Sequence, residues 1–209
     1  MDVPPARLAH WLDDFDARHR VVRSIYGPEA LRLEAGDGAV AECHPAFPPL
    51  SECGEHEGLA AAALIAHAGR DRVVGVLLAR LGGHAVGVFE GDRLVASRVG
   101  SRPVHGRHAN GGWSQQRFAR RREGQVRVAG EAAADDAVRV LVPAVPRLEA
   151  VVLGGDRRAV DPLRADQRLA GVLALETDRF LATPEPRLAV LLAAPGQFRA
   201  VRIRLEEPA

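Results

Sequence analysis

The chain has 209 residues, of which 47% are hydrophobic, and its formal net charge at pH 7 is +1. This apolar content is enough for a packed core and excludes a globally disordered chain, while two cysteines are too few for a disulfide scaffold. The near-neutral charge excludes a uniformly basic protein, so any affinity for nucleic acid must come from a local patch.

Targeting and membrane segments are not expected. Residues 1–5 do not combine a basic start with an apolar run, and no apolar run reaches the roughly 18–20 residues of a membrane helix. We therefore expect a cytoplasmic protein with no membrane partner. We also expect a monomer. The length fits one domain, or a main domain with a smaller N-terminal appendage. We expect an appendage over residues 1–69, with its integration into the main domain as the alternative, and a catalytic domain over 70–209.

The N-terminal part predicts a small α/β arrangement. Its first segment has apolar side chains at a spacing of three and four, which is typical of an amphipathic helix, and a Gly-Asp-Gly turn separates two short apolar segments. Proline-rich sequence then indicates a loop. We expect these elements in order: a helix over 6–20, strands over 30–34 and 39–43, a loop over 44–56, and a helix over 60–68.

Three apolar segments follow at short intervals and predict an antiparallel meander. Gly82-Gly83 and Gly91-Asp92 separate them, and such pairs favour tight hairpin turns. The strands are expected over 73–81, 84–90 and 93–99.

A long helix is expected after the meander, because Ser114 is a good N-cap and apolar residues then recur to about Leu141. The remaining elements are expected to be a buried strand over 148–153, mostly helix over 157–194, and a closing strand over 198–205. The whole order predicts a mixed α/β sheet with helices on its faces, compatible with a ribonuclease-H-like arrangement.

One segment differs from the rest in charge. From Ser101 to Arg122 the chain has six arginines, two histidines and no acidic residue. Glu123 is the only acid close by and cannot neutralise the arginines that precede it, so the excess positive charge favours a surface that binds nucleic acid. The segment contains this run: Gly111-Gly112-Trp113-Ser114-Gln115-Gln116-Arg117-Phe118-Ala119-Arg120-Arg121-Arg122.

This run, which follows a three-stranded meander and opens a long helix, resembles the catalytic domain of the Vms-like release factors, and their actinobacterial branch in particular. That family is related to the central domain of eukaryotic and archaeal class-1 release factors, whose tip carries Gly-Gly-Gln. The resemblance covers roughly residues 70–209. It implies a peptidyl-tRNA hydrolase of ribosome quality control, which frees a nascent chain from tRNA on the large ribosomal subunit and needs no cofactor.

The resemblance implies that a glutamine after the glycines is the working residue. By position this is Gln115, with Gln116 as the alternative, because two residues separate the glycines from the first glutamine. A glutamine amide does not titrate near pH 7, so its expected role is to orient a water toward the ester carbonyl, while backbone N–H groups near the glycines meet the developing oxyanion. The predicted catalytic set is Gly111, Gly112, Ser114, Gln115 and Gln116.

The basic residues of the segment are expected to bind phosphates, and its tryptophan either stacks on an unpaired base or anchors the loop to the domain. The expected partners are peptidyl-tRNA and the RNA of the large ribosomal subunit. The predicted RNA-binding set is Arg102, Arg107, His108, Trp113, Arg117, Arg120, Arg121 and Arg122.

Two alternatives use the same segment. Some relatives cut the tRNA near its 3′ end, with the loop aligning a ribose hydroxyl as the nucleophile. A ribosome- or tRNA-binding adaptor would use the arginines only to dock, and would not need the glycine–glutamine element.

Metal and nucleotide chemistry are not expected. A metal-dependent nuclease of the ribonuclease-H type needs carboxylates along its first strands, and the segment 73–81 has none. Cys43, His44, Cys53 and His56 offer a zinc-like spacing, but the first two are adjacent and the loop between the pairs is proline-rich. The sequence contains no phosphate-binding loop or dinucleotide fingerprint.

Overall fold

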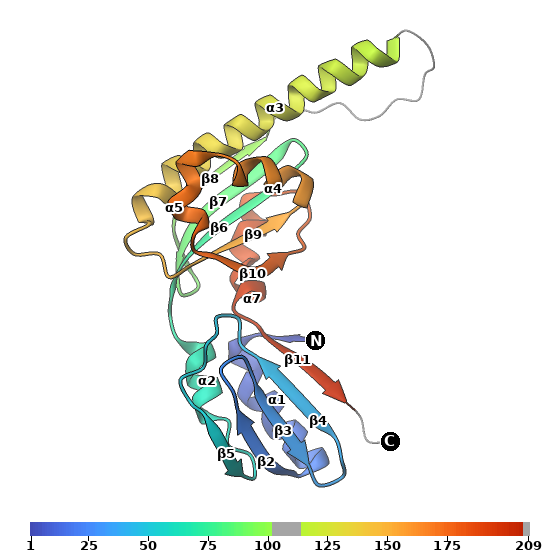
Figure 1. The fold of residues 1–209 in the computed structure, drawn as a ribbon, viewed down its shortest axis with the longest axis vertical. Helices are drawn as coiled ribbons and strands as arrows, with labels where there is room; N and C mark the ends of the chain where they lie inside the picture. The colour runs from blue at the N-terminus through green and yellow to red at the C-terminus, as the bar shows by residue number, and fades with distance from the viewer. Residues whose placement is uncertain (102–113, 207–209) are drawn as a thin grey trace. The chain divides into compact units, whose positions relative to one another are not determined.

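The structure is a computed structural model that describes the backbone of residues 1–101 and 114–206 and the side chains of residues 1–101 and 124–206. The chain divides into two compact units (Figure 1). Unit 1 comprises Met1–Asp71 and Pro195–Ala209, and unit 2 comprises Arg72–Ala194. Unit 2 is therefore inserted in the sequence between two segments of unit 1.

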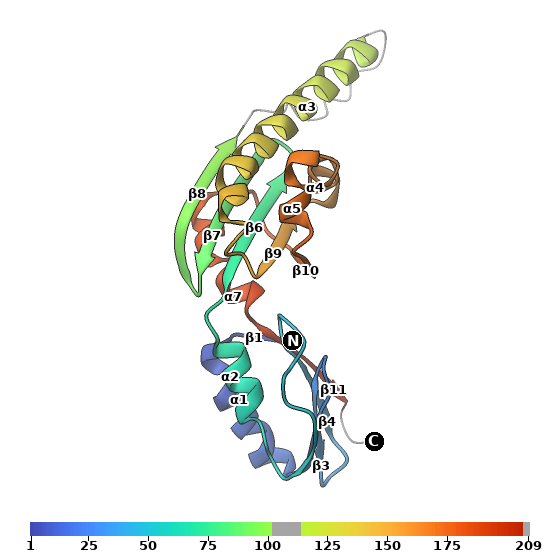
Figure 2. The ribbon, with the colours of Figure 1, turned by 60° about the vertical axis from the view of Figure 1, so that its left-hand side comes forward.

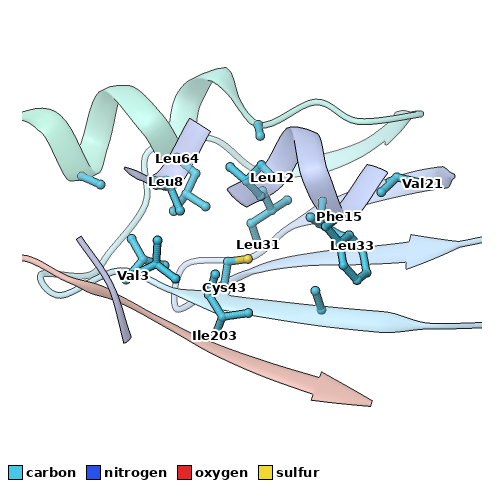
Figure 3. Packing of buried hydrophobic residues seen from close by; sticks show 14 of the residues in the cluster. Val3, Leu8, Leu12, Phe15, Val21, Leu31, Leu33, Cys43, Leu64 and Ile203 are labelled. Atoms are coloured by element: carbon cyan, nitrogen blue, oxygen red, sulfur yellow. The ribbon is translucent and has the colours of Figure 1, made fainter. Parts of the chain in front are cut away.

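Unit 1 is a six-stranded antiparallel sheet with two longer helices on one face (Figures 2 and 3). Its strand order is β1-β11-β4-β3-β2-β5. Its elements are β1 (Asp2–Val3), α1 (Pro5–His19), β2 (Val21–Tyr26), β3 (Leu31–Ala35), β4 (Val40–His44), β5 (Gly54–Glu57), α2 (Ala62–Gly69), α7 (Pro195–Phe198) and β11 (Val201–Glu206).

The core of unit 1 lies between the sheet and α1. Leu8, Leu12 and Phe15 recur at helical spacing on one side of α1, and all three are buried. They face Leu31 and Leu33, which share one face of β3 because strand side chains alternate (Figure 3). Burying a side chain of this size contributes about 1.5–3 kcal/mol, so this layer holds α1 against the sheet.

Unit 2 is a five-stranded mixed sheet in the order β10-β9-β6-β7-β8. The meander β6-β7-β8 is antiparallel, whereas β9 is parallel to β6 and β10 is parallel to β9. Its elements are β6 (Val73–Arg80), β7 (Gly83–Glu90), β8 (Arg93–Ser101), α3 (Ser114–Leu141), β9 (Ala150–Gly155), α4 (Arg157–Arg164), α5 (Ala170–Leu173), β10 (Glu176–Leu181) and α6 (Leu188–Ala193), with short 3₁₀ turns at Val142–Ala144 and Gln167–Leu169.

Helices cover both faces of this sheet (Figure 2). Val86 and Val88 of β7 are buried in the cluster that contains Ala137 of α3. Gly87 lies on the opposite face of β7, where a Cβ would be 3.1 Å from Cδ2 of Leu191 in α6. Alternation along one strand therefore separates the face under α3 from the face under α6.

Two features differ from the sequence expectations. The segment 157–194 contains the helices α4, α5 and α6, as expected, but it also contains the edge strand β10, whose polar sequence lacks a buried-strand pattern. The closing strand exists at Val201–Glu206, but it pairs with β4 and β1 in unit 1 and not with the meander. The residues after Ala194 belong to unit 1, so unit 2 spans Arg72–Ala194, whereas the catalytic domain is expected over 70–209.

The helices expected over 6–20 and 60–68, the first hairpin and the three-stranded meander are confirmed within two residues at most boundaries. The long helix ends at Leu141 as expected. β2 was not expected, and β5 falls at the end of the segment predicted as a loop. None of the helices within the described ranges is both long enough and apolar enough to cross a bilayer.

Candidate functional site

The candidate site is the segment that joins β8 to α3. Two groups of predicted site residues differ in what the structure describes. Outside the described residues lie Arg102, Arg107, His108, Gly111, Gly112 and Trp113. In the first turns of α3, with backbone but not side chains described, lie Ser114, Gln115, Gln116, Arg117, Arg120, Arg121 and Arg122.

The element before the segment, β8, finishes at one end of the unit 2 sheet. Ser101, the last residue of β8, pairs with Gly83, and Ala79 near the end of β6 pairs with Gly155 at the end of β9. The ends of three strands therefore meet at the sheet edge where the candidate segment leaves β8. We call this the segment edge.

The C-terminal half of α3 is packed on the sheet. Ala133, Ala134 and Ala137 are buried, and their small side chains allow the helix to approach β7 and β8 closely. Leu141 is fully buried at the end of the helix. This half therefore anchors α3 to unit 2.

The preceding half of α3 is not packed in this way. Val126 and Val128 are 36% and 42% exposed, and a Cβ on Gly124 or Gly130 would have no neighbour within 4 Å. Figure 1 shows this N-terminal half of α3 extending beyond the strands of the unit 2 sheet. Among the side chains described from residue 124 onward, the apolar stripe expected from the sequence is thus buried only after residue 132.

A buried polar pair, His84 with Asp136, joins the packed half of α3 to β7. Nε2 of His84 lies 2.9 Å from Oδ2 of Asp136, and the two side chains are 5% and 18% exposed. The ring of His84 also occupies the space beside Gly100, where a Cβ would be 2.4 Å from Cε1 of the imidazole. No sequence pattern indicates this pair, because its members are 52 residues apart and belong to no motif.

Residues 72–204 match the sequence model of the protein family described as Actinobacteria/chloroflexi VLRF1 release factor. The chain belongs to this family. The match covers all of unit 2 and continues into β11. It confirms the resemblance to Vms-like release factors that the sequence indicated, and it links this VLRF1-family protein to translation and the ribosome.

Two solved structures are also similar to this VLRF1-family chain. The crystal structure of the archaeal translation termination factor aRF1 has a TM-score of 0.47 at 13% sequence identity, and the match covers 94% of this chain and 73% of that one. A structure described as an archaeal protein has a TM-score of 0.40 at 15% identity, covering 92% and 69%. No curated protein matches the chain.

Acidic partners accompany the arginines that the structure describes next to α3 in this VLRF1-family protein. Arg168 lies 2.8 Å from Asp135 of α3 and 2.7 Å from Asp166, and its hydrogen bonds hold the pKa of Asp166 below the usual range. Arg127 pairs with Glu131 one turn along the helix at 2.6 Å. These two arginines therefore differ from those of the segment 101–122, because each of them has an acidic partner and that segment contains no acidic residue.

A shallow groove of about 350 Å³ lies between α4 and β10, and none of the predicted site residues lines it. Arg164 donates hydrogen bonds to both carboxylate oxygens of Glu176, and the guanidinium of Arg157 lies 4.5 Å from the ring centroid of Phe180. These contacts hold α4 against the edge strand of the VLRF1 domain. The groove-lining residues are Arg157, Arg164, Glu176, Thr177, Asp178 and Phe180.

The zinc alternative finds no supporting geometry. Cys43 points into the core of unit 1, whereas His44 follows it on β4 and therefore lies on the other face of the sheet. Cys53 is exposed. Among the side chains that the structure describes, no group of three His, Cys, Asp or Glu is placed to hold a metal ion.

Proposed function

We propose that this VLRF1-family protein hydrolyses peptidyl-tRNA on the large ribosomal subunit, and so frees stalled nascent chains in ribosome quality control. Membership of a release-factor family is the observation that carries the proposal. The position of the Gly-Gly and Gln-Gln element supports it, because the glycines follow β8 in the sequence and the glutamines belong to the first turn of a projecting helix. The proposal places the protein in the cytoplasm, as a monomer, with peptidyl-tRNA and ribosomal RNA as partners.

The proposed reaction is attack of water on the ester that joins the peptide to the terminal ribose. The water oxygen forms a bond to the carbonyl carbon, and the ribose 3′ oxygen leaves and takes up a proton. We assign the orientation of that water to the Gln115 carboxamide, with Gln116 as the alternative. Such positioning contributes several kcal/mol to the barrier when the geometry is held tightly.

The glycines that precede these amides have a complementary role in the proposal. Backbone N–H groups at Gly111 and Gly112 donate to the oxyanion that develops on the carbonyl oxygen. Glycine suits this position because it has no side chain to block the approach of the ester. The 2′-hydroxyl of the terminal adenosine supplies a further polar group beside the leaving oxygen.

The length of the projecting helix supports a site that acts at a distance from the domain. Ala133 is the first buried residue among the described side chains of α3, and Ser114 precedes it by about 19 residues. At 1.5 Å per residue, Ser114 lies roughly 28 Å along the helix axis from that anchor. A projection of this length suits delivery of the segment into a recessed, RNA-lined centre.

We also infer that unit 2 has the ribonuclease-H-like arrangement expected from the sequence. The strand order supports this inference, because the antiparallel meander β8-β7-β6 is continued on its other side by the parallel strands β9 and β10. Metal-dependent nucleases of this arrangement hold their metal ions with carboxylates along the first strands. Here β6 has no acidic residue, and the single acidic residue of β7 is Glu90 at its end.

The proposal is tested with Gln115→Ala, Gln116→Ala and the double variant on stalled ribosome–nascent-chain complexes that carry peptidyl-tRNA. We expect the change at the working glutamine to slow release about 100-fold, the order of magnitude lost when a reacting group is misplaced. Gln125→Ala is the matched control, because it removes an amide from the same helix about three turns away. Full activity of the double variant would refute the assigned role.

The same reactions distinguish the two alternatives. An intact tRNA 3′ end after release indicates ester hydrolysis, whereas a shortened tRNA on a denaturing gel indicates the nuclease. A Gln115→Ala variant that binds ribosomal complexes like the wild type but does not release peptide indicates an enzyme. An adaptor predicts that this variant behaves like the wild type in every assay.

A further inference from the structure

His84 contacts both elements that flank the candidate segment. It is the second residue of β7, and its buried imidazole meets the carboxylate of Asp136 on α3 through the 2.9 Å contact of Nε2 with Oδ2. Because both groups are largely removed from water, losing either one leaves a buried polar atom without its partner. The contact therefore couples the sheet to α3 more specifically than apolar packing does.

On the other side of the segment, His84 lies against β8. His84 and Gly100 are cross-strand partners, and a Cβ at Gly100 would lie 2.4 Å from Cε1 and 2.7 Å from Nε2 of the imidazole. Real Cβ atoms do not approach this closely, so the ring uses space that only glycine leaves open. Gly100 precedes Ser101, the last residue of β8 before the candidate segment.

Asp136 has two further cationic neighbours. Nη1 of Arg98, on β8, lies 3.6 Å from its Oδ1, and Nη1 of Arg139, one turn along α3, lies 3.7 Å from the same oxygen. One carboxylate on α3 is thus in contact with β7 through a hydrogen bond and with β8 through an ion pair. The flanking elements of the segment meet at this carboxylate.

A small rotation of α3 at this point would move the candidate segment far. Ser114 lies about 22 residues before Asp136, or roughly 33 Å along the helix axis at 1.5 Å per residue. A tilt of about 5° over that length displaces Ser114 by about 3 Å, and a misplacement of about 1 Å can cost 100-fold in rate. The exposed half of α3, around Val126 and Val128, has little packing to resist such a tilt.

We propose that His84 and Asp136 form a positioning clamp that fixes the direction of α3 relative to β8, and thereby the place of the segment that carries Gly111 to Gln116. Neither residue is catalytic, since the clamp acts through the backbone elements that it joins. Its effect on peptide release rests on the function proposed above, whereas its effect on the direction of α3 does not.

The direction of α3 is measured directly by the distance between two spin labels within unit 2. Labels are attached through Arg127→Cys on α3 and Arg93→Cys at the far end of β8, both of which are well exposed, in a chain in which Cys53→Ser removes the exposed native thiol. We expect a narrow distance distribution for this parent. His84→Ala and Asp136→Ala are expected to shift or broaden it.

The matched control is Val86→Ala, which removes a buried side chain from the same face of β7 but leaves the His84–Asp136 contact. It is expected to keep the distribution of the parent. Asp136→Asn retains a hydrogen-bonding group and is expected to lie closer to the parent than Asp136→Ala. Should His84→Ala fail to fold, as judged by circular dichroism, the two Asp136 variants test the clamp. A distribution closer to the parent in Asp136→Asn than in Asp136→Ala supports the clamp, and equal distributions contradict it.

Gly100→Ala tests the steric half of the clamp. The new Cβ must displace the imidazole from Asp136, so we expect a broadened distribution in otherwise native protein. In the His84→Ala background the ring is absent and the same change has room, so the double variant is expected to match His84→Ala alone. An added effect of Gly100→Ala in that background contradicts the proposed contact.

In the peptide-release assay, His84→Ala is expected to lower kcat about 10- to 100-fold while KM changes less than about 3-fold, because the segment is misplaced and RNA contacts persist. A wild type that releases no peptide defeats the proposed function but leaves the spin-label comparison valid. Unchanged distance distributions in His84→Ala and Asp136→Ala overturn the clamp, whatever the release activity.

Discussion

Gly155 and Ala79 approach each other so closely that a Cβ on Gly155 would lie 2.1 Å from the carbonyl oxygen of Ala79. Gly155 ends β9 with a φ of +103°, a conformation that side chains disfavour. The N–H of Asp156 then donates to the same Ala79 oxygen at 2.8 Å, and the Asp156 side chain caps α4 by accepting from the N–H of Arg158. The turn from β9 into α4 at the segment edge therefore depends on glycine.

Gly155→Ala is expected to lower the free energy of unfolding by more than about 2 kcal/mol, because it adds both backbone strain and a clash with a carbonyl that cannot rotate away. Urea denaturation followed by circular dichroism measures this change. Gly171→Ala, in α5, is the matched control, since a Cβ there meets nothing within 4 Å. Equal midpoints for the two variants would contradict the observed geometry.

Gly130→Ala is expected to stabilise the protein, whereas Gly155→Ala is expected to destabilise it. Gly130 lies inside α3 with open space around the position of a Cβ, so alanine adds helix propensity without a steric cost. The expected gain is about 0.5–1 kcal/mol in the stability of the helix, measured as slower amide hydrogen exchange in the exposed half of α3. Faster exchange would show that residue 130 is not helical in solution.

The two cysteines are expected to differ in reactivity. Burial raises the pKa of the Cys43 thiol to about 12, whereas Cys53 is exposed. The thiolate is the reactive form, so at pH 8 a thiol with a pKa near 12 stays protonated as well as inaccessible. A colorimetric thiol reagent should therefore titrate one thiol in the native protein and two in guanidinium chloride. Two reactive thiols in the native protein would be inconsistent with the packing of unit 1.

If the arginines of the segment bind phosphates as predicted, the affinity of the protein for the ribosomal complex should fall as the salt concentration rises. Replacing Arg120, Arg121 and Arg122 by glutamine is expected to weaken binding to the ribosomal complex and to reduce the slope of log K against log salt by about 0.7–0.9 for each phosphate that is no longer bound. Arg93→Gln is the control, because Arg93 lies at the opposite end of β8 from the candidate segment. An unchanged slope in the triple variant would remove these arginines from the RNA interface.

The sequence predicted best where local signals are strong. Ser114 as a cap and the apolar repeat to Leu141 located α3, and the glycine turns located the meander. β10 was missed because an edge strand does not need an apolar run, and its sequence is largely polar. β11 was located as a strand but assigned to the wrong sheet, because alternation specifies a strand and not its partner.

One part of the candidate site could be predicted from local sequence, and another part could not. The glycine–glutamine run is a contiguous motif, so the sequence alone indicated it and the family to which the chain belongs. The assignment of Gln115 over Gln116 stays a prediction. The contact of His84 with Asp136 depends on the pairing of β7 with β8 and on the packing of α3, so no local pattern predicts it.

The placement of β11 between β1 and β4 affects the order in which the two units can fold during translation. A ribosome translates all of Arg72–Ala194 before it reaches Val201, so unit 2 has its full set of strands while the first sheet still lacks an internal one. Until β11 arrives, β1 has no hydrogen-bonding neighbour and one edge of β4 is open. During its own synthesis, the unit that carries the arginine-rich helix is therefore ready to fold first.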